Sequence, residues 1–180
     1  LDNLTIAAPI LHRLGVPATI FTVSDRVGTD QLFWWEQLAE MLRRSPRQTL
    51  DGVDRILPGS ELPARLQLIG PGARERAHEV ISAGLLPLPQ AMVDERLRAI
   101  AVALETDLPA NGRRFPLADW AQLRSARDLG ITVGAHSRSH ANLAAADEAA
   151  IADEVDGSLA ATTAALGDRP MAFAYPYGAN

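Results

Sequence analysis

The stretch ITVGAHSRSH (residues 131–140) places a short run of apolar and β-branched residues directly before two histidines. A short run of this composition, preceded by a turn signal such as Gly130, is typical of a buried strand. His136 and His140 therefore follow the C-terminal end of a predicted strand. In α/β proteins with parallel strands, active sites gather at this end of the sheet.

Two further strands are predicted, and each of the three follows a stretch of helical periodicity that ends at a glycine. Glycine readily takes the left-handed conformation that ends many helices. The predicted strands cover residues 18–23, 131–135 and 171–175, and the glycines are Gly15, Gly130 and Gly167. Strands separated by helices favour a parallel sheet or barrel with right-handed crossovers, so we expect an α/β fold.

A long segment between the first two strands is rich in proline and glycine. It begins with an amphipathic helix over residues 31–44 and has further helical patterns over residues 73–83 and 91–104. After the first of these helices, no strand pattern and no cluster of chemically active residues is visible. We interpret residues 30–115 as a helical insertion within a single domain that covers residues 1–180.

Composition excludes several classes of function. The chain has 17 basic and 22 acidic residues, a net charge of −5 and no basic block, so a nucleic-acid partner is not expected. It has no cysteine, so a bound metal would need histidine and carboxylate ligands. Its apolar stretches are shorter than the roughly 20 residues of a membrane-spanning helix, and we expect no such span.

The histidine pair has two interpretations from spacing alone. Within one helical turn, residues four apart have Cβ atoms about 5–6 Å from each other, so His136 and His140 could bind one cation. A catalytic zinc site adds a third protein ligand, commonly a carboxylate. Ser137 follows His136 where zinc metalloproteases have glutamate, so that class is not favoured. The alternative is that both histidines are polar loop residues bonded to backbone or solvent.

A second polar segment, FAYPYG (residues 173–178), follows the last predicted strand. A tight turn here can point backbone N–H groups at a developing oxyanion, and the amide of Tyr177 is the candidate donor. A plain proline-glycine turn covered by aromatic side chains explains the same residues without any function. Ser137 and Ser139 lie beside histidines, but without a G-x-S-x-G pattern a serine nucleophile is not favoured.

Taken together and in order, three segments resemble the polysaccharide deacetylases, also called carbohydrate esterase family four or the NodB homology group: NLTIAAPILHRLGVPATIF, ITVGAHSRSHANL and MAFAYPYG. GAHSRSH is similar to the family's H-[ST]-x-x-H motif, which implies that His136 and His140 bind a divalent metal, usually zinc. FAYPYG is similar to the R-x-P-[FY]-G motif, which implies that Pro176, Tyr177 and Gly178 shape the substrate groove and the oxyanion site. The resemblance implies a partial, distorted (β/α) barrel.

The chain departs from the family pattern in three places. The T-F-D-D-G motif, which supplies the third metal ligand and the catalytic base, is not present, and Asp2 resembles the aspartate just downstream of it. The motifs that provide the general-acid histidine would lie after residue 180. Ala174 stands where many members have an arginine that braces the base aspartate, although a subset reads FAYPYG. We therefore expect the chain to correspond to the middle of the family's domain.

The resemblance implies a metal-dependent hydrolase that removes N-acetyl groups from an amino-sugar polysaccharide or oligosaccharide. The long segment after FWWEQL suits the subset that includes bacterial deacetylases of surface and exported polysaccharides. We thus expect a bacterial protein, either cytoplasmic or associated with the cell envelope. Two alternatives stay open: a catalytically inactive carbohydrate-binding relative, and another metal-dependent hydrolase such as a phosphoesterase.

Overall fold

The computed structural model describes residues 2–59, 61–113 and 116–178. The chain divides into two compact units, each described by itself: unit 1 comprises Leu1–Asp30 and Arg113–Asn180, and unit 2 comprises Gln31–Gly112. The interpretation of residues 30–115 as an insertion within one domain stays a prediction, and its end at residue 115 lies outside the described residues.

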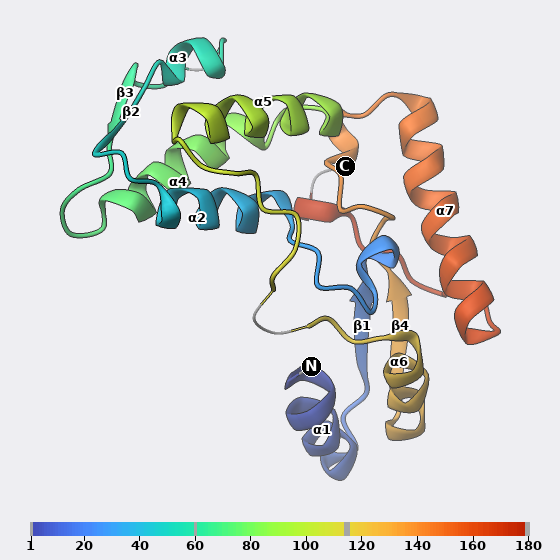
Figure 1. Cartoon of the computed structure of the whole chain (residues 1–180). Coiled ribbons are helices and arrows are strands. Elements are labelled where there is room, and N and C mark those ends of the chain that lie inside the picture. The colour runs from blue at the N-terminus through green and yellow to red at the C-terminus, as the bar shows by residue number, and fades with distance from the viewer. Residues whose placement is uncertain (1, 60, 114–115, 179–180) are drawn as a thin grey trace. The chain divides into compact units, whose positions relative to one another are not determined.

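Unit 1 combines several short helices and one long helix, α7, with a small parallel sheet (Figure 1). Its elements are η1 (Asn3–Ala7), α1 (Ala8–Leu14), β1 (Ala18–Thr22), η2 (Ser24–Arg26), α6 (Trp120–Ala126), η3 (Arg127–Leu129), β4 (Ile131–Ala135), η4 (Leu143–Ala145), α7 (Glu148–Leu166) and η5 (Pro176–Gly178), where η marks short 3-10 or π helices. β1 and β4 pair in parallel, in the register that joins Ala18 to Ile131.

The parallel sheet confirms a mixed α/β fold, but the described residues form no barrel. The third strand predicted over residues 171–175 is reduced to one bridge, in which Phe173 pairs with Ala135. The Ala135 N–H donates to the Ala172 carbonyl at 3.0 Å, and the Ala174 N–H donates to the Ala135 carbonyl at 2.9 Å. These two bonds place the segment before Pro176 at the C-terminal end of β4.

The helix ends of unit 1 follow the glycine pattern. Gly15, Gly130 and Gly167 all take the left-handed conformation, with φ of 66°, 76° and 87°. Helix α7, which ends at its C-cap Gly167, begins at Glu148. Asp147 caps the helix by accepting a hydrogen bond from the Ala150 N–H at 2.8 Å, so α7 begins after it.

Unit 2 contains four helices and a hairpin among its described residues: α2 (Trp34–Arg44), β2 (Thr49–Asp51), α3 (Val53–Ile56), β3 (Arg65–Gln67), α4 (Ala73–Leu85) and α5 (Gln90–Ala103). The antiparallel pair of β2 and β3 corrects the expectation that this segment has no strand. Each strand has only three residues, too few for the alternation that predicts a strand to be visible.

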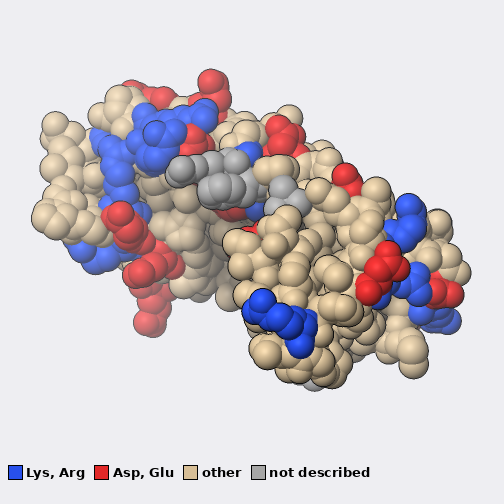
Figure 2. Space-filling model, turned by 90° about the horizontal axis from the view of Figure 1, so that it is seen from below, with Lys and Arg blue, Asp and Glu red and all other residues tan. Residues whose placement is uncertain are grey.

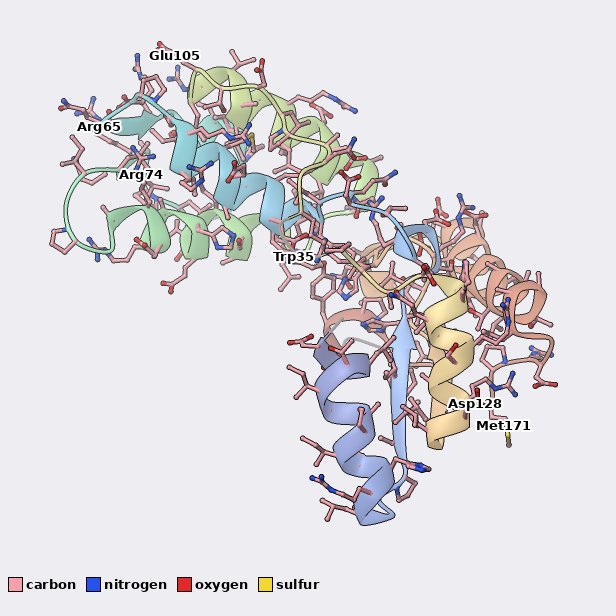
Figure 3. All side chains as sticks on the ribbon, turned by 60° about the horizontal axis from the view of Figure 1, so that its bottom comes forward. Trp35, Arg65, Arg74, Glu105, Asp128 and Met171 are labelled. Atoms are coloured by element: carbon pink, nitrogen blue, oxygen red, sulfur yellow. The ribbon has the colours of Figure 1, made fainter. Side chains whose placement is uncertain are left out.

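The core of unit 2 is a continuous apolar cluster. Helix α2 contributes Leu38, Met41 and Leu42, and the other fully buried members include Leu50, Ile81, Leu85, Leu97, Ile100 and Leu104. Arg74 donates to the carbonyl groups of Leu42 and Ser45 at the C-terminal end of α2 (Figure 3). These contacts satisfy backbone acceptors that have no partner within the helix.

The apolar cluster of unit 1 is much smaller. Its buried members are Ala8, Ala126 and Ile131. Large apolar side chains of the same unit remain at the surface, and Met171, 97% exposed, projects from the segment after α7 (Figure 3). Hydrophobic burial alone therefore stabilises unit 1 less than unit 2.

The surface carries both signs of charge. Figure 2 shows acidic and basic side chains beside one another in several places on one face. In α2, the hydrogen bond from Arg43, with help from Arg44, lowers the pKa of Glu40 to about 2. Within the described ranges, none of the helices has the length and apolarity needed to cross a membrane.

Candidate functional site

The loop between the two histidines starts where β4 ends. The His136 N–H donates to the Thr22 carbonyl at 3.0 Å, so the backbone pairing of the sheet continues to the first histidine. Ser137 and His140 then have φ of 62° and 72°. Residues other than glycine rarely adopt this conformation, and its occurrence at two positions of one loop indicates a functional constraint.

The same loop brings the two imidazole rings together. The ring centroids of His136 and His140 are 4.7 Å apart, and the ring planes are nearly perpendicular, at 88°. The spacing argument assumed one helical turn, but residues 136–140 form a non-helical turn instead. The turn is closed by the His140 N–H, which donates to the Oγ of the buried Ser137 at 2.9 Å. The two rings therefore come together by a backbone path that is not helical.

The protonation of the His136 ring follows from its partner. Its Nδ1 lies 2.8 Å from the carbonyl oxygen of Ala174. Because a carbonyl can only accept, Nδ1 carries the proton in this bond. In the neutral ring, Nε2 then has a free lone pair, which is the state in which histidine binds a metal.

The His140 ring is kept neutral by its surroundings. Burial lowers its pKa to about 4, and the neighbouring His136 acts in the same direction, while the charge of Glu154 opposes the change. The charged imidazolium form is disfavoured because it would lose hydration on burial. At neutral pH His140 is thus a neutral base with a lone pair.

The FAYPYG segment lies next to the histidines. The ring centroids of Tyr177 and His140 are 4.8 Å apart, at 89° to each other. Pro176 is buried, Tyr177 has a φ of 62°, and the Gly178 N–H donates to the Tyr175 carbonyl at 3.1 Å. The structure thus brings His136, His140 and Tyr177 together.

Comparison with known protein families shows to which family the chain belongs. The sequence model of the polysaccharide deacetylase family matches residues 88–180, just over half of the chain. The chain belongs to the polysaccharide deacetylase family. No match was found among curated proteins or among solved structures. Membership in the polysaccharide deacetylase family suggests a deacetylase that hydrolyses a polysaccharide substrate.

Members of this family are generally metal-dependent, and the ligands available here can be examined directly. His136 and His140 are adjacent, the bond to Ala174 uses Nδ1 of His136 and leaves its Nε2 for a ligand, and burial keeps His140 neutral, which suits two positions of a cation site. Among residues 2–59, 61–113 and 116–178, however, no group of three or more histidine or acidic side chains could hold a metal ion. Within the described ranges, the two adjacent imidazoles are therefore the candidate nitrogen ligands.

One site residue was missed from the sequence. Glu154 of α7 is buried, and its carboxylate accepts hydrogen bonds from the backbone of the histidine loop. A signal for it existed in the spacing, because Glu154, Ser158 and Thr162 lie four residues apart in an alanine-rich stretch. The structure shows that all three are buried. Polar side chains repeated at this spacing share one face of a helix, and on a face that packs against the protein they need partners.

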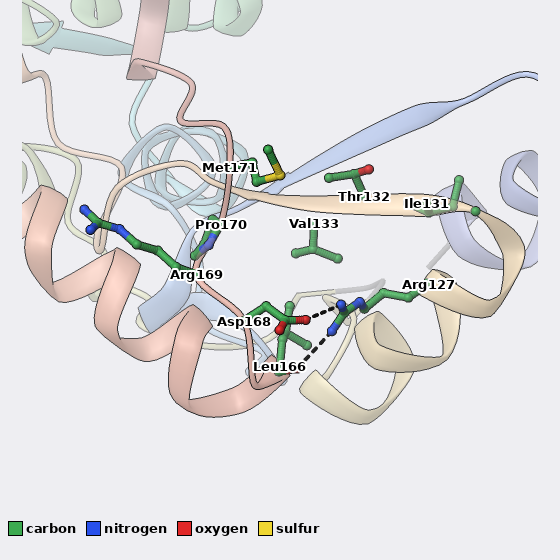
Figure 4. Close-up of a pocket in the computed structure, with 10 residues that line it drawn as sticks. Arg127, Ile131, Thr132, Val133, Leu166, Asp168, Arg169, Pro170 and Met171 are labelled. Atoms are coloured by element: carbon green, nitrogen blue, oxygen red, sulfur yellow. Dashed lines mark hydrogen bonds and ion pairs between the residues drawn. The ribbon is translucent and has the colours of Figure 1, made fainter.

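A cavity of about 550 Å³ lies elsewhere in unit 1 (Figure 4). It is lined by the first residues of β4, Ile131 to Val133, whereas the histidines follow the last residue of this strand. At its edge, Arg127 donates to the Leu166 carbonyl at 2.9 Å and to Asp168 at 2.5 Å (Figure 4). None of the predicted site residues lines this cavity.

Proposed function

We propose that the protein is a metal-dependent hydrolase that removes N-acetyl groups from an amino-sugar polysaccharide or oligosaccharide. The observation that carries this proposal is the meeting of the His136, His140 and Tyr177 rings at the end of a parallel strand in a member of the deacetylase family. In the reaction, water adds to the carbonyl carbon of the acetamide. The C–N bond then breaks, and the products are acetate and a free amine on the sugar.

His136 and His140 are the proposed ligands of a divalent cation, most simply zinc, because imidazole nitrogen is a preferred zinc ligand. When bound, such a cation acts as a Lewis acid that polarises a carbonyl and lowers the pKa of water. The chain's own contribution is orientation, since the bond from His136 to the Ala174 carbonyl fixes the tautomer and tilt of the ring. The third ligand and the catalytic base of the T-F-D-D-G motif are not supplied by residues 1–180.

The FAYPYG turn is the proposed oxyanion and substrate-binding element. We assign the backbone N–H of Tyr177 to the developing oxyanion, and Pro176 and Gly178 to the shape of the groove. The left-handed backbone at Tyr177 and its ring contact with His140 support this placement. One such donor typically contributes about 2.7–4 kcal/mol of transition-state stabilisation.

The test is removal of either imidazole from a purified protein that contains the complete deacetylase domain. His136→Ala and His140→Ala should each lose zinc, measured by elemental analysis, and lose acetate release from N-acetylated chito-oligosaccharides, as a chelator should in the wild type. His12→Ala is the matched control, because His12 lies in α1 and its ring bonds the Leu129 carbonyl. Unchanged zinc content in both site variants would refute the assignment.

The second candidate function that we propose is that of a relative that binds carbohydrate without catalysis. Saturable binding of chito-oligosaccharides without acetate release, with or without added zinc, would identify this alternative. Hydrolysis of a phosphate ester in place of the acetamide would identify another metal-dependent hydrolase.

A further inference from the structure

Glu154 is the only charged residue classed as buried in the part of the chain that the structure describes. Its Oε2 accepts hydrogen bonds from the backbone N–H groups of Arg138 and Ser139, at 2.9 and 2.8 Å. Its Oε1 accepts from the Ser139 hydroxyl at 2.5 Å. A single carboxylate thus binds both residues at the middle of the loop that joins the two histidines.

The opposite side of this loop is bound by the segment that follows β1. The Ser24 N–H donates to the Ser137 carbonyl at 3.2 Å, and the Asp25 N–H donates to the Arg138 carbonyl at 3.0 Å. The loop is therefore held between two elements, by its carbonyl groups on one side and by its N–H groups on the other. The bonds to the loop carbonyl groups come from backbone N–H groups, whereas the bonds from the loop N–H groups of Arg138 and Ser139 go to the side chain of Glu154.

The loop also packs directly against α7. The side chain of Arg138 lies over Gly157, where a Cβ atom would come within 2.7 Å of the Arg138 Cδ. The guanidinium group bridges Asp25, at 3.0 Å, and Asp153, at 2.8 Å. Helix α7 thus presents two carboxylates to the loop: Glu154 to its backbone and Asp153 to a side chain.

The conformation that needs this support is a costly one. Ser137 and His140 are both left-handed, and such residues persist only where the surroundings hold them. The bonds from Glu154 fall on the two residues between them. Loss of these bonds would allow the loop to relax to ordinary backbone angles, and the rings of His136 and His140 would separate.

We propose that Glu154 is a positioning residue, which holds the loop in the conformation that lets His136 and His140 bind one cation. The inference rests on the proposed function in taking the two histidines as metal ligands. Glu154 itself is not a ligand, because its oxygens are occupied by the loop. The effect of Glu154 on the loop depends on the length of its side chain and the geometry of its hydrogen bonds, and not on its charge.

Two single substitutions separate the effect of side-chain length from the effect of charge. Glu154→Asp keeps the charge but shortens the side chain by one methylene, so its carboxylate no longer spans the distance to both N–H groups. Glu154→Gln loses the charge but keeps the length: its amide oxygen can accept both N–H groups, and its NH₂ can donate to the Ser139 hydroxyl. The matched control is Asp153→Ala, which removes a charge one residue away without touching the loop backbone.

Two readouts are needed, one with metal and one without. The first is the affinity for Zn²⁺, measured by competition with a chromophoric chelator at a temperature where circular dichroism shows each variant folded. Glu154→Asp should weaken it by about 10- to 100-fold, the usual effect of losing a partner behind the ligands. Glu154→Gln and Asp153→Ala should each weaken the affinity for Zn²⁺ by much less than about 10-fold. The second readout is the nuclear Overhauser effect between the His136 and His140 rings in the metal-free protein, which only Glu154→Asp should weaken.

The outcomes are distinct. The inference would be overturned if Glu154→Asp kept the zinc affinity and the ring contacts of the wild type. It would also be overturned if Glu154→Gln lost as much zinc affinity as Glu154→Asp, because the effect would then depend on charge. If the wild type bound no Zn²⁺, the metal assignment of the proposed function would fail. The ring contacts of the metal-free variants would still decide whether Glu154 positions the histidines.

Discussion

Unit 2 is stabilised by a continuous apolar core, whereas unit 1 combines a small apolar cluster with hydrogen bonds around the histidine loop. Apolar burial is non-directional and scales with area, so it stabilises a compact unit without aiming any particular group. Hydrogen bonds depend on direction and distance, and they can hold a strained loop in one conformation. The unit with the smaller apolar core is the one that holds the candidate site.

The largest expected effect tests the core of unit 2. Leu38 is 0% exposed, and Leu38→Ala should lower the free energy of unfolding by about 2–5 kcal/mol, because it removes apolar contacts and leaves a cavity. Urea denaturation followed by tryptophan fluorescence measures the change. Val102, 79% exposed, provides the control, and Val102→Ala should have little effect. Equal effects of the two substitutions would contradict the importance of the buried cluster.

A smaller effect is expected where the sheet of unit 1 leaves no room. Phe21 is the register partner of Gly134, and a Cβ on Gly134 would lie 2.6 Å from the Phe21 ring and 3.0 Å from the Ala172 carbonyl oxygen. Gly134→Ala should therefore destabilise the protein by about 1–3 kcal/mol, as overpacking usually does.

The control for this substitution is the double variant Phe21→Ala with Gly134→Ala. Removal of the ring takes away the closest contact, so the free energy of unfolding should fall by less than the sum of the two single effects. Full additivity in urea denaturation would show that the ring and the glycine do not constrain each other.

The smallest effect concerns the pH dependence of unit 1. Burial first, and His136 second, lower the pKa of His140 from 6.5 to about 4, so the unfolded chain binds a proton that the folded protein rejects. The stabilising contribution of neutral His140 is therefore complete above pH 6.5 and is lost as the pH falls towards 4. One proton gives a slope of at most about 1.4 kcal/mol per pH unit, and partial exposure of the ring reduces it further.

Urea denaturation of the wild type and of His140→Gln between pH 4 and 7 measures this contribution. The substitution removes the ionisable ring, so the variant should lose the part of the pH dependence that belongs to His140. Parallel pH profiles of the two proteins would show that His140 does not have the lowered pKa.

The sequence was informative wherever local chemistry decided the structure. Gly15, Gly130 and Gly167 ended their helices as predicted, because only glycine takes the left-handed conformation at little cost. The buried strand before His136 was confirmed at its predicted bounds. The deacetylase resemblance, based on three segments of which two lie within the matched residues 88–180, was confirmed by the family match.

Prediction failed where contacts distant in the sequence decided the result. The hairpin of β2 and β3 was missed, because its strands are too short to show a pattern and depend on each other for pairing. The segment predicted as a third strand makes only one bridge to β4. Glu154 was missed because its partners, Arg138 and Ser139, lie 16 and 15 residues earlier in the chain.

The sequence by itself determined that the chain belongs to the polysaccharide deacetylase family, that two histidines follow a buried strand, and that an aromatic turn lies near the end of the chain. These properties follow from residue type and spacing, which act over a few neighbours. Only the tertiary structure decided that the rings of His136, His140 and Tyr177 meet, and that Glu154 supports the loop between the histidines. The reason is physical: such contacts require a sheet and a helix to pack together, and their geometry depends on the whole unit.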